Sequence, residues 1–69
     1  MTATAIALDA RIYKQAAVNA AVREYKQLAR VSVESHAGTL LITFKDYPQE
    51  YKDTIAHEFC NYVLWKLGN

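Results

Sequence analysis

Thr39-Leu40-Leu41-Ile42-Thr43-Phe44 is the densest run of β-forming residues in the chain, and it decides the fold. Leu40, Ile42 and Phe44 share one face of this stretch, because side chains two residues apart lie on the same side of a strand. The pattern therefore predicts a strand with at least one buried face. We expect it to be the central strand of a small sheet.

The residues just before this run predict its partner. Val31–Ser35 alternates apolar and polar side chains, as a half-buried strand does. It is followed by His36, Ala37 and Gly38, and Gly38 can take the positive φ that a short hairpin connection demands. We therefore expect an antiparallel hairpin.

A third strand is predicted at the start of the chain. Thr2–Leu8 alternates larger side chains with alanines, so the side that carries Ile6 and Leu8 can face a core. The alanine side is too small to bury much surface. This pattern predicts an edge strand.

Two stretches have helical periodicity. In Lys14–Ala29, one side is apolar and the opposing arc is polar. In Pro48–Leu67, Pro48 suits the first turn of a helix and Gly68 suits its end. The apolar side of this second helix is broad and consists of Tyr51, Ile55, Ala56, Phe59, Cys60, Val63 and Leu67.

The predicted order of elements is therefore β-α-β-β-α in a single domain, residues 1–69. A strand-helix-strand crossover is right-handed and the strands of a hairpin are neighbours, so Thr39–Phe44 is placed between the other two strands. Both helices then cover one face of a three-stranded sheet. The predicted fold class is α+β, a two-layer sandwich.

Composition limits the function. The chain has 69 residues and a net charge of +1, which is far from the dense positive field of a nucleic-acid-binding protein. It has no apolar run of about 18 residues and no basic region before its first apolar residues, so neither a membrane span nor a signal peptide is predicted. We expect a cytoplasmic protein without nucleic-acid or membrane partners.

No catalytic or metal-binding constellation stands out. His57 and Cys60 are three residues apart on the second predicted helix, but two ligands do not complete a metal site. A nucleophilic pair of the same residues lacks an orienting third group, and Glu58 and Glu24 are isolated carboxylates. We therefore predict no catalytic residue, no metal and no cofactor. A small enzyme that uses His57 with Cys60 or Glu58 is the weakest alternative.

Aromatic side chains and an open strand edge suggest contact surfaces instead. Trp65 projects away from the apolar side of its helix, so it either folds over the rim of the sheet or anchors a partner. Tyr13 and Tyr51 lie near element ends, where a ring can be half exposed. The edge strand is poor in charge, so Thr4, Ile6 and Leu8 are candidates for pairing with a strand of another chain.

A set of short motifs spans nearly the whole chain. They are Leu8-Asp9, Tyr13, Ala16-Ala17, Ala20-Ala21, Tyr25, the Val31 and Val33 strand, Glu58-Phe59 and Asn61-Tyr62-Val63-Leu64. Together they resemble the small HxsD-like proteins of the His-Xaa-Ser system.

This resemblance implies a role beside radical-SAM enzymes that modify ribosomally made peptides, some of them spliceases that excise part of a tyrosine. The chain has a single cysteine and no CxxxCxxC motif, so it is not the radical enzyme itself. We expect a non-catalytic accessory subunit that binds the radical-SAM enzyme, its precursor peptide, or both. The alternative is a free-standing homodimeric structural or regulatory module without a peptide partner.

Overall fold

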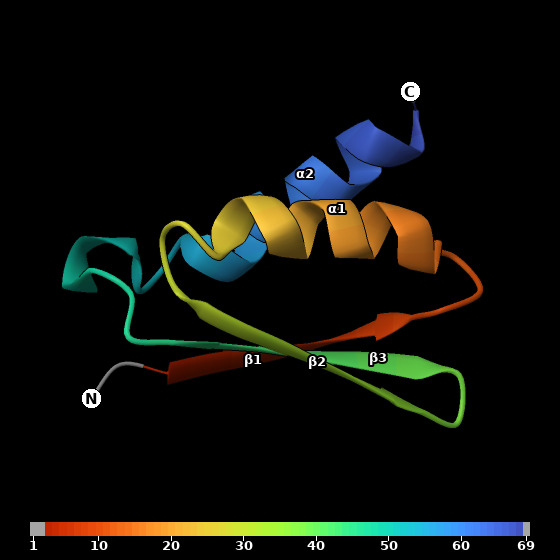
Figure 1. The fold of residues 1–69 in the computed structure, drawn as a ribbon, viewed down its shortest axis with the longest axis horizontal. Coiled ribbons are helices and arrows are strands. Elements are labelled where there is room, and N and C mark those ends of the chain that lie inside the picture. Colours follow the sequence, from red (N-terminus) through yellow and green to blue (C-terminus); the bar gives the residue numbers. More distant parts are fainter. Residues whose placement is uncertain (1–2, 69) are drawn as a thin grey trace.

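The computed structural model describes residues 3–68, which fold into a three-stranded antiparallel sheet with both helices on one face (Figure 1). The predicted α+β fold and its β-α-β-β-α order are confirmed. The elements are β1 (Ala3–Asp9), α1 (Gln15–Tyr25), β2 (Arg30–His36), β3 (Thr39–Lys45), the 3-10 helix η1 (Gln49–Tyr51) and α2 (Ile55–Leu67).

β3 is the central strand, as its sequence predicts, and the strand order is β1-β3-β2. Ile42 pairs with Ile6 on one side and with Val33 on the other. The β2–β3 hairpin turns on Ala37 and Gly38, whose φ angles of 50° and 82° are both positive. Two positive φ angles define the turn whose twist matches that of the flanking strands.

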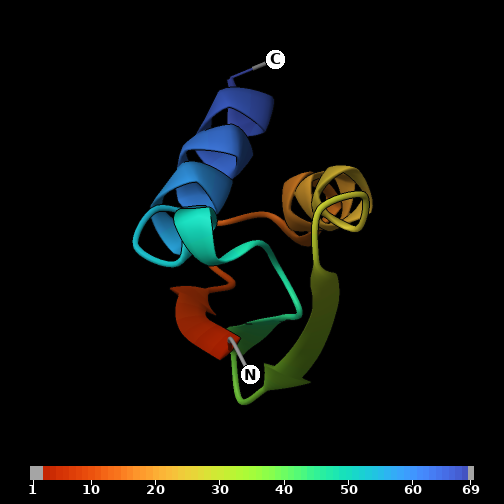
Figure 2. The same ribbon diagram turned by 90° about the vertical axis from the view of Figure 1, so that its left-hand side faces the viewer.

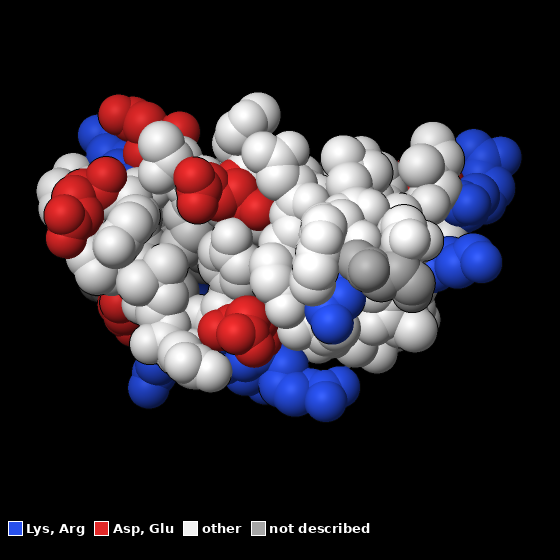
Figure 3. All heavy atoms as spheres, turned by 90° about the horizontal axis from the view of Figure 1, so that it is seen from above, with Lys and Arg blue, Asp and Glu red and all other residues white. Residues whose placement is uncertain are grey.

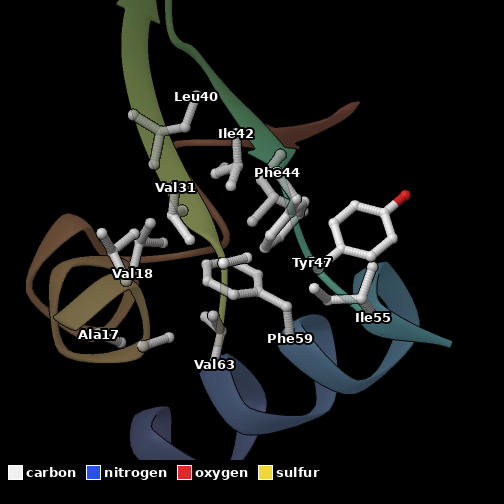
Figure 4. Close-up of a cluster of buried hydrophobic side chains, with 14 residues drawn as sticks. Ala17, Val18, Val31, Leu40, Ile42, Phe44, Tyr47, Ile55, Phe59 and Val63 are labelled. Atoms are coloured by element: carbon white, nitrogen blue, oxygen red, sulfur yellow. The ribbon is translucent and has the colours of Figure 1, made fainter. Parts of the chain in front are cut away.

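The core lies between the sheet and the two helices (Figure 4). Leu40, Ile42 and Phe44 of β3 are at most 1% exposed, and Phe44 meets Phe59 of α2 edge-on at 5.1 Å between ring centroids. Helix α1 presents Val18 with alanines beside it. The short alanine side chains let this helix approach the other layers closely.

The helices are shorter than their periodicity predicts. Helix α1 ends at Tyr25, not Ala29, because the chain tightens into turns and enters β2 at Arg30. The expected single helix over Pro48–Leu67 is interrupted. Thr54, at φ −122°, leaves the helical region and separates η1 from α2.

This interruption changes which side chains are buried. Tyr51 falls outside α2, loses the helical phase that would place it beside Ile55, and is 38% exposed. In two perpendicular views, α2 starts close to the sheet and rises away from it toward Leu67 (Figures 1 and 2). Its second half therefore packs against α1 and not against the strands.

The first strand, predicted over Thr2–Leu8, is described as β1 over Ala3–Asp9, so it extends one residue beyond its predicted end. Thr2 lies outside the described residues. Asp9 ends the strand by closing a turn: its carbonyl oxygen accepts bonds from the amides of Ile12 and Tyr13, and its carboxylate accepts a bond from the Arg11 amide at 2.8 Å.

Candidate binding edge

The outer edge of β1 carries the free backbone groups of the sheet's first strand. The amide of Ala10 donates to the carbonyl of Gly38 at 2.9 Å, which continues the β1–β3 ladder by one pair. Hydrogen-bonded and non-hydrogen-bonded residue pairs alternate in an antiparallel ladder. The backbone amides and carbonyls of Leu8, Ile6 and Thr4 therefore form hydrogen bonds with β3. The amides and carbonyls of the residues between them point outward.

Those residues are Ala5 and Ala7, and Ala3 before Thr4 follows the same alternation. The side chains of all three alanines are exposed on the face of the sheet away from the helices. An alanine methyl group does not shield its own backbone groups, and no charged side chain occurs in β1 before Asp9. Every residue of β1 has one partner in β3, so no bulge bends the edge away. An unbulged, uncharged edge of this kind accepts another strand.

The helix-facing side of β1 is partly covered. Thr4 and Ile6 are half-buried, and the Thr4 Oγ1 and Tyr47 Oη atoms are 2.5 Å apart in a hydrogen bond. Tyr47 itself is 4% exposed and fixes the connection after β3 against the start of β1. Thr4 and Ile6 therefore line the rim where the edge meets the core.

The other predicted contact residues are distributed over the molecule. Leu8 is 6% exposed, so its side chain belongs to the core, and its backbone faces β3. Tyr13 is half-buried in the β1–α1 connection. Tyr51 is exposed and belongs to η1, a turn that lies on the helix side of the sheet (Figure 2).

Trp65 belongs to a second surface, at the end of α2 away from the sheet. It is 58% exposed, and its neighbour Leu64 is 49% exposed. Its ring is tilted against Tyr62 at 5.7 Å between centroids, and the Lys66 ammonium lies 5.2 Å from the ring centroid. The Trp65 ring is therefore exposed in the structure, and its role as an anchor for a partner stays a prediction. The structure does not bring Trp65 to the β1 edge.

The candidate catalytic side chains lie apart from this edge on α2. Burial raises the pKa of the Cys60 thiol, which keeps it protonated and a poor nucleophile. Burial, with the negative charge of Glu58, also raises the pKa of Tyr25. Residues 3–68 contain no group of three or more His, Cys, Asp or Glu side chains placed to hold a metal ion.

Charge is mixed across the surface. Seen from the helix side, acidic side chains gather toward the end where η1 lies and basic side chains toward the opposite end and along one flank (Figure 3). With a net charge of +1, the molecule has no dominant field of one sign. No field of one sign therefore marks the candidate edge at Ala5 and Ala7, which itself carries no charged side chain.

The sequence named Thr4, Ile6 and Leu8 on β1 as candidates for pairing with another strand, and that role stays a prediction. In the structure the backbone groups of these three residues face β3, whereas the outward amides belong to Ala5 and Ala7. The two-residue turn at Ala37 and Gly38 is the sequence feature that could have predicted which amides point outward. A turn of this length makes His36–Thr39 a bonded pair, which fixes the alternation across the whole sheet.

Comparisons of the chain with protein-family models, with curated proteins and with solved structures give no match. Within residues 3–68, neither helix has the length and apolar character needed to cross a lipid bilayer.

Proposed function

We propose that this chain is a cytoplasmic, non-catalytic accessory subunit of a radical-SAM peptide-modifying system. It binds the enzyme, its ribosomally made precursor peptide, or both, and presents the peptide for modification. The observation that carries the proposal is the free edge of β1, an unbulged seven-residue strand whose outward backbone groups belong to unshielded alanines. The resemblance of its motifs to HxsD-like proteins supplies the enzyme class.

Peptide capture uses strand addition. An extended segment of the precursor pairs with Ala3, Ala5 and Ala7, and these main-chain bonds supply affinity without demanding a particular sequence. Register comes from the helix-facing rim, where side chains of the added strand meet Thr4 and Ile6 beside η1. The added strand also buries the uncovered edge of β1.

Enzyme contact uses the end of α2. Trp65 and Leu64 offer exposed apolar area in the last turns of α2, and this end of the helix lies away from the sheet (Figure 1). The peptide and the enzyme therefore occupy separate surfaces. Tryptophan is enriched among residues that dominate binding energy. Separate surfaces allow one small subunit to hold both partners at once.

The central experiment measures binding of a fluorescently labelled precursor peptide to wild type and to Ala5→Pro. Proline removes an amide that points outward, so the β1–β3 ladder stays intact while the added strand loses a bond and meets the ring. We expect affinity to fall at least about tenfold. Ser35→Pro is the matched control, because the Ser35 amide points outward at the opposite edge of the sheet.

A second pair of variants separates the two surfaces. Ala7→Lys places a charge on the β1 edge and is expected to weaken peptide binding alone. Trp65→Ala is expected to weaken co-purification with the radical-SAM enzyme by about thirtyfold or more while peptide affinity stays unchanged. The proposal fails if wild type binds neither partner and peptide modification proceeds equally well without it.

A further inference from the structure

One face of the sheet is covered by no other part of residues 3–68. Both helices lie on the other side, which leaves this open face bare along all three strands (Figure 1). Its middle is built from small side chains, with Ala5, Thr43 and Ser32 in one row across the strands and Leu41, 39% exposed, in the next. Small side chains allow another layer to approach closely.

The two ends of the open face differ in shape and charge. At one end, Lys45 and Arg30 are paired neighbours, and the Arg30 side chain is 83% exposed. At the other end, beside the hairpin turn, there is a hollow of about 550 Å³ lined by Glu34, His36, Ala37, Thr39 and Leu41. One end thus offers long basic side chains and the other a hollow with a carboxylate.

We propose that this open face binds a second copy of the chain, with the twofold axis lying across the strands. The alternative axis, along the strands, would stack Lys45 and Arg30 on their own copies and bring like charges together. A twofold axis perpendicular to the strands reverses the strand direction of the second protomer. The end of the face that carries Arg30 then lies over the hollow of the partner. The same contact then forms twice, as twofold symmetry requires.

The Arg30 side chain fits this hollow chemically. Its aliphatic stem can lie on Leu41 while its guanidinium pairs with Glu34. Within its own protomer, Arg30 already forms a salt bridge with Asp46, at 3.6 Å from Nε to Oδ2. That bond uses Nε, so the terminal amino groups remain able to donate to a second carboxylate. The contact therefore adds to the existing pair and does not break it.

The size of the face sets the strength of the dimer. Three strands of seven residues cover about 23 Å by 14 Å, roughly 300 Å². This footprint is smaller than the roughly 800 Å² per partner of a standard interface, so the dimer is expected to be weak and salt-sensitive. The outer edges of β1 and β2 stay free in this arrangement, and the proposal does not depend on the proposed function.

Charge reversal gives a direct test by analytical ultracentrifugation of wild type over a concentration series at low salt. We expect reversible dimerisation, weakened roughly tenfold or more by either Arg30→Glu or Glu34→Arg, because each change turns both symmetric contacts repulsive. An equimolar mixture of the two variants is expected to recover dimers. In that mixed pair, each of the two contacts again joins an acidic and a basic side chain.

The controls keep the result interpretable. Arg23→Glu makes the same charge change on the exposed surface of α1 and should leave dimerisation unchanged. Circular dichroism of each variant shows that it is folded. A wild type that stays monomeric throughout, a dimer indifferent to both reversals, or a mixture that fails to recover would each overturn the proposal.

Discussion

The two outer strands of this sheet have the same length and the same partner, yet they present different edges. β1 and β2 each pair seven residues with β3. On β1 the outward backbone groups belong to alanines and the strand has no charge before Asp9. On β2 they belong to Val31, Val33 and Ser35, and the alternating residues whose backbone groups face β3 include Arg30, Glu34 and His36.

The difference indicates which edge is protected against pairing. Charged side chains along an edge oppose the approach of another strand, whereas small neutral ones permit it. α1 lies over the β2 side of the sheet and the start of α2 over the β1 side (Figure 2). Both edges therefore sit beneath a helix, and side-chain chemistry alone makes β1 the better acceptor.

The largest expected effect comes from the strand that both edges share. Ile42→Ala removes a fully buried side chain paired with Ile6 and Val33, so it should lower the free energy of unfolding by about 2–5 kcal/mol. A domain this small has little stability to lose. Urea denaturation followed by circular dichroism measures the change.

Leu41→Ala is the matched control for Ile42→Ala, since the Leu41 side chain points to the open face of the sheet and is 39% exposed. Its expected cost is below about 1 kcal/mol. Equal costs at positions 41 and 42 would contradict the placement of the core on one face only.

The second effect concerns the amides of the two edges. Ala5 and Ala7 should exchange with solvent at least about 100-fold faster than Ile6, whose amide bonds to β3. Val33 on the other edge should also exchange fast. Hydrogen exchange followed by NMR checks the alternation, and added precursor peptide should protect Ala5 and Ala7 while leaving Val33 unchanged. Protected alanine amides in the free protein would mean that the alternation is reversed.

The third effect compares two interactions that join the connection after β3 to the outer strands. Tyr47 bonds to Thr4 at the start of β1, whereas Asp46 forms an exposed salt bridge with Arg30 at the start of β2. Tyr47→Phe leaves the half-buried Thr4 hydroxyl without its partner and should cost about 1 kcal/mol. Asp46→Asn should cost less than about 0.5 kcal/mol, because exposed ion pairs contribute little. Thermal melting of both variants compares the stability that the hydrogen bond and the salt bridge contribute. A larger loss of stability in Asp46→Asn would contradict this prediction.

The smallest effect is a pH dependence at the end of β1. Hydrogen bonds from the Arg11 side chain and amide hold the pKa of Asp9 below its ordinary value. The carboxylate therefore contributes stability above about pH 4, and this contribution is lost as the pH falls through the lowered pKa. Melting temperatures of wild type and Asp9→Asn should converge at low pH and separate near neutrality. A constant difference at every pH would exclude this linkage.

Much of the fold follows from residue patterns. The alternation in Thr39–Phe44 and Val31–Ser35, the turn at Gly38 and the apolar sides of the helices are local signals, and each is confirmed with small shifts of its ends. The break before α2 was not predictable in this way. Tyr51 extends the apolar period of α2 backwards, and only the non-helical backbone at Thr54 removes it from that side.

The sequence by itself determined the order of elements, the central place of β3 and the choice of β1 as an open edge, because strand period, turn residues and charge are properties of short segments. Only the tertiary structure decided which backbone groups are free, since bonding direction alternates with register and register depends on both strands. It also decided that Trp65 is exposed, because α2 rises away from the sheet, and it brought Arg30 and the hollow beside Glu34 to opposite ends of one bare face. These outcomes require elements distant in sequence to be placed together, which no local pattern specifies.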